Sequence, residues 1–332
     1  MKQNKNSLRI AFFEVQPWEK EIIERYAKEL GADVFSDEVE NAIDLAKNYE
    51  IISCFIYSDL SEKTLKQLPN LKMIASRSTG LDHIDLNYCE KHKITVASVP
   101  HYGENTVAEH TFALILALSR KIVEGVDLVR RGGFSPVNLT GFDLAGKTLG
   151  IVGVGSIGLY VAKIAHGFGM KILGVARHQD TKLAKKLKFE YVNLEECLKR
   201  SDIVTLHLPL TKETFHLINR QNIALMKPGA LLINTSRGPV IETEAILWAL
   251  EQKIIAGAGL DVLEEEENLD DPKKLFGSYL SKDDLSELVC AHLLREKPNV
   301  IITPHNAFNT KEAIERIVLT TTENIKNFLI SN

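Results

Sequence analysis

Short apolar runs alternate with amphipathic stretches along most of the chain. In the first hundred residues the strand-like runs are 8–13, 51–56, 71–75 and 94–99, and apolar residues recur at helical spacing over 19–30 and 61–67. Strands that alternate with helices are typical of a parallel sheet covered by helices. The pattern therefore predicts a first α/β domain of about 100 residues.

A second series of elements begins near the middle of the chain. Apolar residues at helical spacing over 104–130 predict one long helix, which Gly132 and Gly133 end. Apolar runs then predict six strands, at 148–152, 172–176, 203–207, 231–234, 258–262 and 300–303. Six strands with helices between them make a complete dinucleotide-binding sheet. The last amphipathic stretch, 311–329, predicts a helix that returns to cover the first domain.

A glycine-rich turn joins the first strand of this second series to a helix. Gly153, Gly155 and Gly158 occupy the three glycine places of G-x-G-x-x-G, with Ser156 and Ile157 between the last two. The first glycine permits the tight turn, the second lets a pyrophosphate approach the backbone, and the third lets helix and strand pack closely. Free amides at the helix start then face the anion. Because another apolar strand follows one helix later, the pattern predicts a dinucleotide site rather than a merely tight turn.

Composition limits the class of the protein and its surroundings. The 332 residues suffice for two domains, and the net charge of −4 argues against a nucleic-acid partner. The N-terminus has no apolar signal region, and the longest apolar run, near 112–118, is too short to span a bilayer. We therefore expect a cytoplasmic protein without membrane contact. The four cysteines show no metal-ligand spacing, so we expect buried thiols and no metal site: Cys54, Cys89, Cys197 and Cys290.

Three polar residues stand just after predicted strands of the second domain. Arg237 follows 231–234, Glu266 follows 258–262, and His305 follows 300–303. Ligands of open parallel sheets collect beyond the carboxyl ends of the strands. There a histidine suits proton transfer, a nearby carboxylate favours its imidazolium form, and an arginine suits capture of a carboxylate. Taken singly, Arg237 is explained equally well as a surface residue, Glu266 as part of a solvated acidic run, and His305 as a helix cap. Their shared placement favours a catalytic site.

The sequence resembles the D-isomer-specific 2-hydroxyacid dehydrogenase family over nearly its whole length. The motifs that carry the resemblance are GVGSIG at 153–158, LHLPLT at 206–211, INTSRG at 233–238, GLDV at 259–262 and TPH at 303–305. The D-lactate dehydrogenase branch looks closest, because of RSTGLDHID at 77–85, VPHY at 99–102 and the long insert between Glu266 and His305.

The resemblance implies a two-domain α/β fold. Residues 1–101 and 305–332 would form a flavodoxin-like substrate domain, and residues 102–304 a Rossmann NAD(P)-binding domain inserted into it. It also implies that His305 donates a proton, that Glu266 pairs with it, and that Arg237 holds the substrate carboxylate. Substrate contacts are implied for Ser78, Thr79, Gly80, Tyr102, Tyr57 and Phe308. Cofactor contacts are implied for Gly153, Gly155, Ser156, Ile157, Gly158, His207, Pro209, Thr235, Ser236 and Asp261, the last accepting from the nicotinamide amide.

One position departs from the NAD-using relatives. Ala176 stands at the end of the second Rossmann strand, where those relatives carry an aspartate. Without that acid a 2′-phosphate meets no repulsion, and the Arg177 and His178 that follow can approach it. The pattern favours NADP acceptance beside NAD, although Arg177 as a solvated surface cation stays open.

We therefore expect an NAD(P)-dependent oxidoreductase that reduces a small 2-oxo acid, pyruvate first, to the D-2-hydroxy acid. A glyoxylate or hydroxypyruvate reductase is the nearest alternative, and Asn309 after Phe308 suggests a more polar or larger substrate. An alternative of another class is a dinucleotide-sensing binding protein that resembles the corepressors of this family. The apolar helix at 106–118 and the resemblance also predict a homodimer through the cofactor domain.

Overall fold

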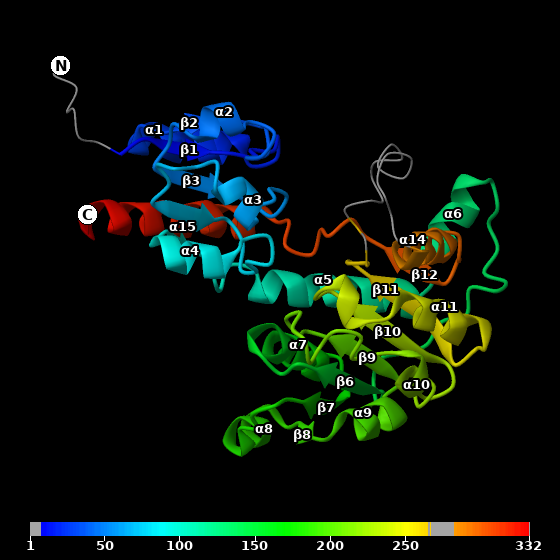
Figure 1. Ribbon diagram of the computed structural model, residues 1–332. Coiled ribbons are helices and arrows are strands. Elements are labelled where there is room, and N and C mark those ends of the chain that lie inside the picture. Colours follow the sequence, from blue (N-terminus) through cyan, green and yellow to red (C-terminus); the bar gives the residue numbers. More distant parts are fainter. Residues whose placement is uncertain (1–7, 265, 267–281, 332) are drawn as a thin grey trace. The chain divides into compact units, whose positions relative to one another are not determined.

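The computed structural model describes residues 8–264, 266 and 282–331, and it contains two compact units (Figure 1). Unit 1 consists of the residues up to Tyr102 together with those from Asn309 onward, and unit 2 runs from Gly103 to Phe308. His305 therefore belongs to unit 2. The polar N-terminal residues 1–7 and most of the insert after Glu266 lie outside the described residues.

Unit 1 is built on a five-stranded, all-parallel sheet in the order β2-β1-β3-β4-β5. The strands are β1 (Ile10–Phe12), β2 (Asp33–Val34), β3 (Ile51–Cys54), β4 (Met73–Ser76) and β5 (Thr95–Ala97). The helices are α1 (Lys20–Leu30), α2 (Ile43–Ala46), α3 (Glu62–Leu65), α4 (Leu86–His92) and α15 (Lys311–Ser331). This strand order is that of flavodoxin-like folds.

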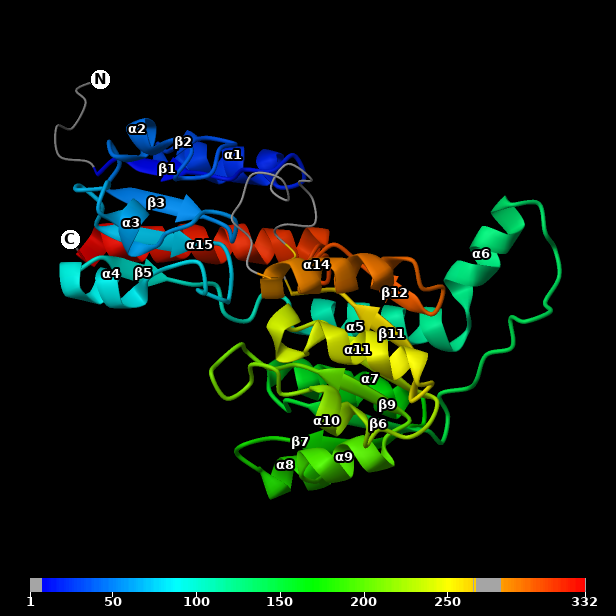
Figure 2. The same ribbon diagram turned by 45° about the vertical axis from the view of Figure 1, so that its right-hand side comes forward.

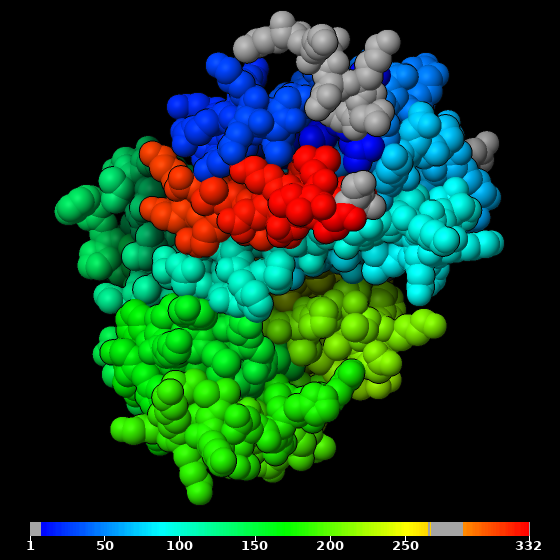
Figure 3. All heavy atoms as spheres, turned by 90° about the vertical axis from the view of Figure 1, so that its left-hand side faces the viewer, coloured from blue at the N-terminus to red at the C-terminus, as the bar shows by residue number. Residues whose placement is uncertain are grey.

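Alternate residues of the unit 1 strands enter two different cores, as the period of a strand requires. Ile10 and Phe12 pack in a core with residues of α1 and α15, including Val318 and Ile325. Ala11 and Phe13 pack in a second core, with residues of α2, α3 and α4. The C-terminal helix α15 thus covers one face of the sheet, and Figure 3 shows it (red) against the residues of α1 (blue).

Unit 2 is built on a seven-stranded, all-parallel sheet in the order β12-β11-β10-β9-β6-β7-β8. Its strands are β6 (Thr148–Val152), β7 (Lys171–Val175), β8 (Glu190–Tyr191), β9 (Ile203–Leu206), β10 (Ala230–Asn234), β11 (Ile255–Leu260) and β12 (Val300–Ile302). Its helices are α5 (Glu104–Ser119), α6 (Ile122–Arg130), α7 (Ser156–Gly167), α8 (Thr181–Leu187), α9 (Leu194–Arg200), α10 (Arg220–Ile223), α11 (Thr243–Glu251), α14 (Lys282–Arg295) and the short 3₁₀ helix η1 (Gly238–Val240). The strand order reverses between β6 and β9, where ligands of doubly wound sheets bind.

The predicted two-domain α/β architecture with parallel sheets is confirmed, with differences in detail. Two edge strands of two residues each were not predicted, β2 in unit 1 and β8 in unit 2. With β8, unit 2 has seven strands among its described residues rather than six. The cysteines are buried as predicted, and burial raises the pKa of the Cys89 and Cys197 thiols to about 11. No described helix is both long and apolar enough to cross a membrane.

The single long helix predicted over 104–130 is wrong. The structure has two helices, α5 and α6, separated at Arg120 and Lys121, and Lys121 has a left-handed backbone with φ of 51°. The carbonyl of Ser119 accepts the amide of Phe142 at 2.9 Å, so it turns to a later segment instead of continuing the helix ladder. A side chain on Gly141 would lie 2.1 Å from that carbonyl oxygen, which explains the glycine at this crossing.

Candidate active site

The glycine-rich turn lies where the strand order of unit 2 reverses. Gly153 follows β6 with φ of +102°, and a Cβ there would lie 2.3 Å from the carbonyl oxygen of His207, which follows β9. A Cβ on Gly158 would lie 2.3 Å from the carbonyl oxygen of Gly153, so helix α7 needs this glycine to pack so closely. A Cβ on Gly155, in contrast, meets nothing within 4 Å. The open side of the turn and the amides at the start of α7 fit a pyrophosphate.

The other predicted cofactor residues follow neighbouring strands of the same sheet. Ala176, Arg177 and His178 come after β7, His207 and Pro209 after β9, and Thr235 and Ser236 after β10. Because parallel strands end at one edge of a sheet, the fold brings these residues to the edge that holds the glycine turn. In doubly wound folds a dinucleotide binds at such an edge, with its adenosine end toward the strand that follows the glycine turn and its helix, which in this chain is β7.

His207 is the one imidazole of the described residues that has a buried nitrogen without a hydrogen-bond partner. Its Nε2 lies 3.0 Å from the hydroxyl oxygen of Thr205, while Nδ1 is buried and unpaired. Burial lowers the pKa of His207 to about 3, so the ring is neutral at physiological pH. An unpaired ring nitrogen beside the glycine turn is available to a polar group of a bound dinucleotide.

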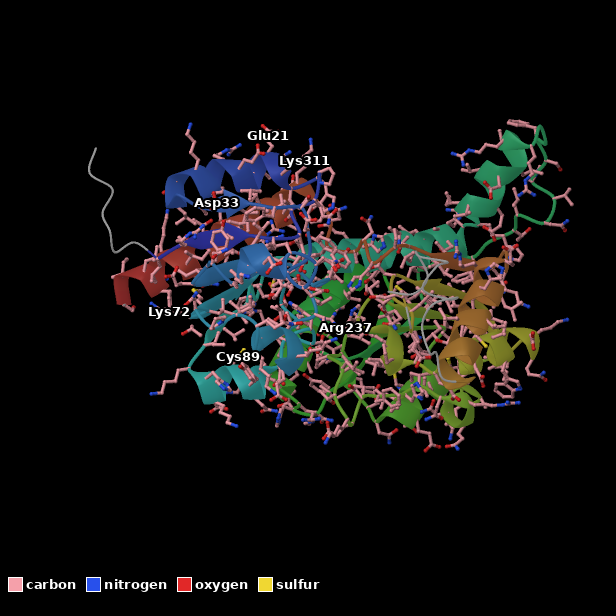
Figure 4. All side chains as sticks on the ribbon, turned by 45° about the horizontal axis from the view of Figure 1, so that its top comes forward. Glu21, Asp33, Lys72, Cys89, Arg237 and Lys311 are labelled. Atoms are coloured by element: carbon pink, nitrogen blue, oxygen red, sulfur yellow. The ribbon has the colours of Figure 1, made fainter. Side chains whose placement is uncertain are left out.

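Arg237 begins a tightly hydrogen-bonded turn after β10 (labelled in Figure 4). The side chain of Asn234 accepts from the amide and hydroxyl of Ser236 and donates to the carbonyl of Arg237 at 2.9 Å. The guanidinium donates one bond of 2.8 Å to the carbonyl of Ser236 and is partly exposed. Next to it, a Cβ on Gly238 would lie 2.0 Å from the carbonyl oxygen of Leu263, so this turn packs against the loop after β11.

His305 and Glu266 form a direct pair. Nδ1 of His305 lies 2.7 Å from Oε1 of Glu266, and the two side chains are 28% and 35% exposed. The other carboxylate oxygen of Glu266 accepts the amide of Leu263 at 3.2 Å. Arg237, Glu266 and His305 follow β10, β11 and β12, which are adjacent strands, so all three stand beyond one sheet edge. A carboxylate on Nδ1 leaves Nε2 as the nitrogen that can exchange a proton with a substrate.

Asp261 holds the turn that carries His305. Its carboxylate accepts the hydroxyl of Thr303 at 2.5 Å and the amides of Asn306 and Ala307 at 2.8 and 2.9 Å. His110 Nε2 lies 3.3 Å from the same carboxylate. Burial opposes ionisation of Asp261, but these hydrogen bonds outweigh it and hold its pKa below the ordinary value. A contact of Asp261 with the nicotinamide amide stays a prediction.

The predicted substrate residues of unit 1 also follow adjacent parallel strands. Tyr57 comes after β3, the segment 78–80 after β4, and Tyr102 after β5. The Ser78 hydroxyl donates to the carbonyl of Gly80 at 2.6 Å, and the Thr79 hydroxyl donates to the carbonyl of Val99 at 2.8 Å. These bonds hold the segment in a fixed loop. Phe308 lies in unit 2 and is buried.

Sequence reasoning missed a buried charged network beneath these loops. Glu14 accepts the amides of Phe55, Tyr57 and Ser58 at 2.9, 3.2 and 2.8 Å, so it fixes the loop that carries Tyr57. Arg77, fully buried, donates to Glu19 at 3.0 Å and to backbone carbonyls after β1. The one available signal was position, since Glu14 and Arg77 each follow directly on a strongly apolar strand.

Comparison with known proteins decides the family. The model of the D-isomer-specific 2-hydroxyacid dehydrogenase NAD-binding domain matches residues 112–307. The chain belongs to this family. It is 37% identical over 319 residues to a 2-hydroxyacid dehydrogenase homologue of Zymomonas mobilis, with 93% of each chain covered. It is 38% identical over 293 residues to a glyoxylate reductase of Thermococcus litoralis, covering 86% of this chain and 82% of the relative.

A solved structure agrees with this membership. The crystal structure of D-lactate dehydrogenase from Aquifex aeolicus, complexed with NAD and lactic acid, matches with a TM-score of 0.87 and 38% identity, covering 97% of this chain and 96% of that one. The predicted family, with a D-lactate dehydrogenase-like branch, is therefore confirmed. As a D-2-hydroxyacid dehydrogenase, the chain is an NAD-binding oxidoreductase of 2-hydroxy and 2-oxo acids.

The pairing of Glu266 with His305 leads to a test by pH. Glu266→Gln removes the negative charge that favours the imidazolium form of His305. Reduction of a 2-oxo acid consumes a proton, so reductase activity of the variant should fall off at a lower pH than in wild type. Profiles of kcat/KM with pyruvate, from about pH 5 to 9, measure the shift. Glu251→Gln, an exposed acid of α11, is the matched control, and an unmoved Glu266→Gln profile would leave Glu266 as a solvated carboxylate.

Proposed function

We propose that this chain reduces a small 2-oxo acid, with pyruvate as the first candidate, to the D-2-hydroxy acid with hydride from NAD(P)H. The observation that carries the proposal is the 2.7 Å pair of His305 and Glu266 beyond the sheet edge that also presents Arg237. A proton donor, its charge partner and a carboxylate-binding cation are the groups that reduction of a 2-oxo acid requires.

Each residue has a defined task in this reaction. The nicotinamide, when bound, supplies the hydride. Arg237 binds the substrate carboxylate through its planar fork and draws electrons from the adjacent carbonyl. His305 donates the proton on Nε2 to the carbonyl oxygen, while Glu266 on Nδ1 stabilises the imidazolium and fixes the orientation of the ring. We propose that the backbone amides of Ser78, Thr79 and Gly80 also bind the carboxylate, and that Tyr57, Tyr102 and Phe308 contact the substrate side chain.

A substrate panel tests this function directly. Pyruvate, glyoxylate and hydroxypyruvate are each incubated with NADH and with NADPH, and cofactor oxidation is followed by absorbance. Chiral chromatography of the product from pyruvate should show D-lactate. Glyoxylate or hydroxypyruvate reduction is the second candidate, favoured by the 38% identity to a glyoxylate reductase. Tight NADH binding without turnover of any 2-oxo acid would instead support a dinucleotide sensor.

We propose that the chain accepts NADP as well as NAD. β7 ends at Val175, and no acid follows until Asp180, whose carboxylate already accepts the amides of Lys182 and Leu183 at the start of α8. Arg177 lies within electrostatic range of Glu213, in the loop after β9. Arg177 and Glu213 follow β7 and β9, the two strands on either side of β6. The absence of a carboxylate at Ala176 and the presence of this cation support the proposal.

A double variant tests the cofactor proposal. Wild type should use NADPH at least comparably to NADH. Ala176→Asp with Arg177→Val restores the acid and removes the cation, and should move preference toward NADH by about 1–3 kcal/mol, the worth of one or two charge-assisted hydrogen bonds and of the added repulsion. Steady-state kcat/KM with both cofactors measures the change, with Lys185→Val on α8 as control. Strong NADH preference in wild type, unaltered in the double variant, would show that Arg177 faces solvent.

We also propose a homodimer formed through unit 2, but on a different helix from the one that the sequence indicated. The apolar residues of α5 are mostly buried in its own unit. Helix α6 has no buried residue, and Figure 2 shows it standing away from the sheet. Its exposed apolar side chains lie on one face at helical spacing: Ile122, Val123, Val126 and Val129, continued by Phe134 and Val137. Such a face is typical of a protein–protein contact.

Charge placed on this face should separate the subunits. Val126→Asp with Val129→Asp puts two carboxylates where a partner's apolar residues would pack, and should shift the protein from dimer to monomer in size-exclusion chromatography with light scattering. Val289→Asp, on α14, substitutes a valine that is 52% exposed and serves as control. An unchanged mass for the double variant would exclude α6 from the dimer contact.

A further inference from the structure

A second histidine–glutamate pair contains Glu264, which stands two residues before Glu266 in the chain. Nε2 of His216 lies 2.5 Å from Oε1 of Glu264, whose side chain is 4% exposed. The other oxygen of Glu264 accepts the amide of Thr243 at 2.7 Å, at the start of α11. The ring of Phe215 stacks on the imidazole at 4.0 Å between centroids, so the orientation of His216 is fixed. A buried carboxylate with two well-formed hydrogen bonds is a firm attachment point for its loop.

This second pair joins the segments that carry the proposed catalytic groups. The amide of His216 donates to the carbonyl of Pro239 at 2.8 Å, in the turn that Arg237 begins. Gly238 in that turn lies so close to the carbonyl oxygen of Leu263 that a side chain at this position would not fit. Glu264 follows Leu263 directly. The carboxylate of Glu266 accepts a hydrogen bond from the amide of Leu263. The chain after β11 is therefore attached at Glu264 to His216 and to the start of α11, and two residues further on Glu266 pairs with His305.

Glu266 needs such an attachment. β11 ends at Leu260, and the amide of Asp261 still donates to the carbonyl of Asn234 at 2.9 Å. Glu266 stands five residues beyond this bond, so the sheet does not fix its position. An error of about 1 Å in placing a catalytic group costs roughly 10²-fold in rate. The side chain of Glu266 itself is 35% exposed.

We propose that His216 and Glu264 are positioning residues that clamp the chain at Leu263 and Glu264, so that the Glu266 carboxylate stays on Nδ1 of His305. The inference rests on the proposed function for its effect on rate, but its structural content stands independently of any substrate. The proposal gives Glu264 and Glu266 different roles. Glu264 attaches the loop to the body of unit 2, and Glu266 serves the reacting histidine.

The kinetic test compares His216→Ala with Glu266→Gln. His216→Ala should lower kcat for 2-oxo acid reduction by about 10²-fold, leave the NADH affinity measured by fluorescence unchanged, and move the upper pH limit of activity downward, as Glu266→Gln does. His216→Gln keeps an N–H donor toward Glu264 and should restore most of the rate. His292→Ala, an exposed histidine of α14, is the control. A uniform loss of activity with an unmoved pH profile would show that His216 only stabilises the fold, and would overturn the proposal.

Proton NMR of the imidazole N–H groups tests the clamp without turnover. The Nδ1–H resonance of His305, assigned by its loss in His305→Gln, should disappear in Glu266→Gln and in His216→Ala, and should persist in His216→Gln and His292→Ala. Persistence in His216→Ala would overturn the clamp even if the enzyme is active. An enzyme that reduces no 2-oxo acid but shows this pattern would refute the proposed function and keep the clamp.

Discussion

His305→Gln should bind NADH as wild type does and lose about 10²- to 10⁴-fold of its turnover with pyruvate, the usual contribution of a positioned general acid. Glutamine fits the space of the imidazole and can donate a hydrogen bond, but its amide cannot release a proton to the carbonyl oxygen. The loss therefore falls on kcat. Fluorescence titration with NADH and steady-state kinetics measure the two properties separately.

A matched substitution shows whether this loss is specific. His292→Gln changes an exposed histidine of α14 in the same way and should leave kcat unaltered. Reduction of pyruvate by His305→Gln at a rate near that of wild type would mean that another group supplies the proton. The backbone at His305 has φ of 47°, a left-handed conformation that histidine adopts more often than most residues other than glycine. Thermal unfolding of wild type and of His305→Gln should therefore be measured beside the kinetics.

Arg237→Lys should lower kcat/KM for pyruvate roughly 30- to 1000-fold, which corresponds to a loss of about 2–4 kcal/mol of transition-state stabilisation. Lysine keeps the positive charge but loses the planar fork that binds both oxygens of a carboxylate. The hydrogen bonds of Asn234 hold the turn through the backbone of Arg237 and through Ser236, so the turn itself should survive the substitution.

Arg200→Lys is the control for loss of an arginine fork. Arg200 binds Glu190 on the surface with both terminal nitrogens, at 3.0 and 2.7 Å, and lies outside the proposed site. Its substitution should leave kcat/KM unchanged. Unchanged kinetics in Arg237→Lys would show that the substrate carboxylate is bound elsewhere, with the amides of Thr79 and Gly80 as the next candidates.

The elements that apolar runs mark were predicted well, and those that rest on tertiary contacts were not. β6 and β10 are buried on both faces, so their apolar side chains make them visible in the sequence. The edge strands β2 and β8 have two residues each and are half exposed, so no run marks them. The end of α5 depends on the bond between Ser119 and Phe142, which nothing in the local sequence announces.

The same division holds at the candidate site. Arg237, Glu266 and His305 were found because each follows a recognisable strand and carries a charged or titratable group. Glu264 was not singled out, because a run of four acids looks solvated until a fold buries one of them beside His216. Whether a charged residue is buried depends on partners far away in the sequence, so composition near that residue does not reveal it.

The covering of unit 1 by α15 sets an order for folding during synthesis. One face of its sheet, with Ile10 and Phe12, is completed by Val318 and Ile325, which are translated after the whole of unit 2. Unit 2 is a continuous segment from Gly103 to Phe308 and can complete its core first. The nascent N-terminal sheet therefore keeps an apolar face open while some two hundred residues are translated, and exposed apolar surface of this kind is prone to aggregation.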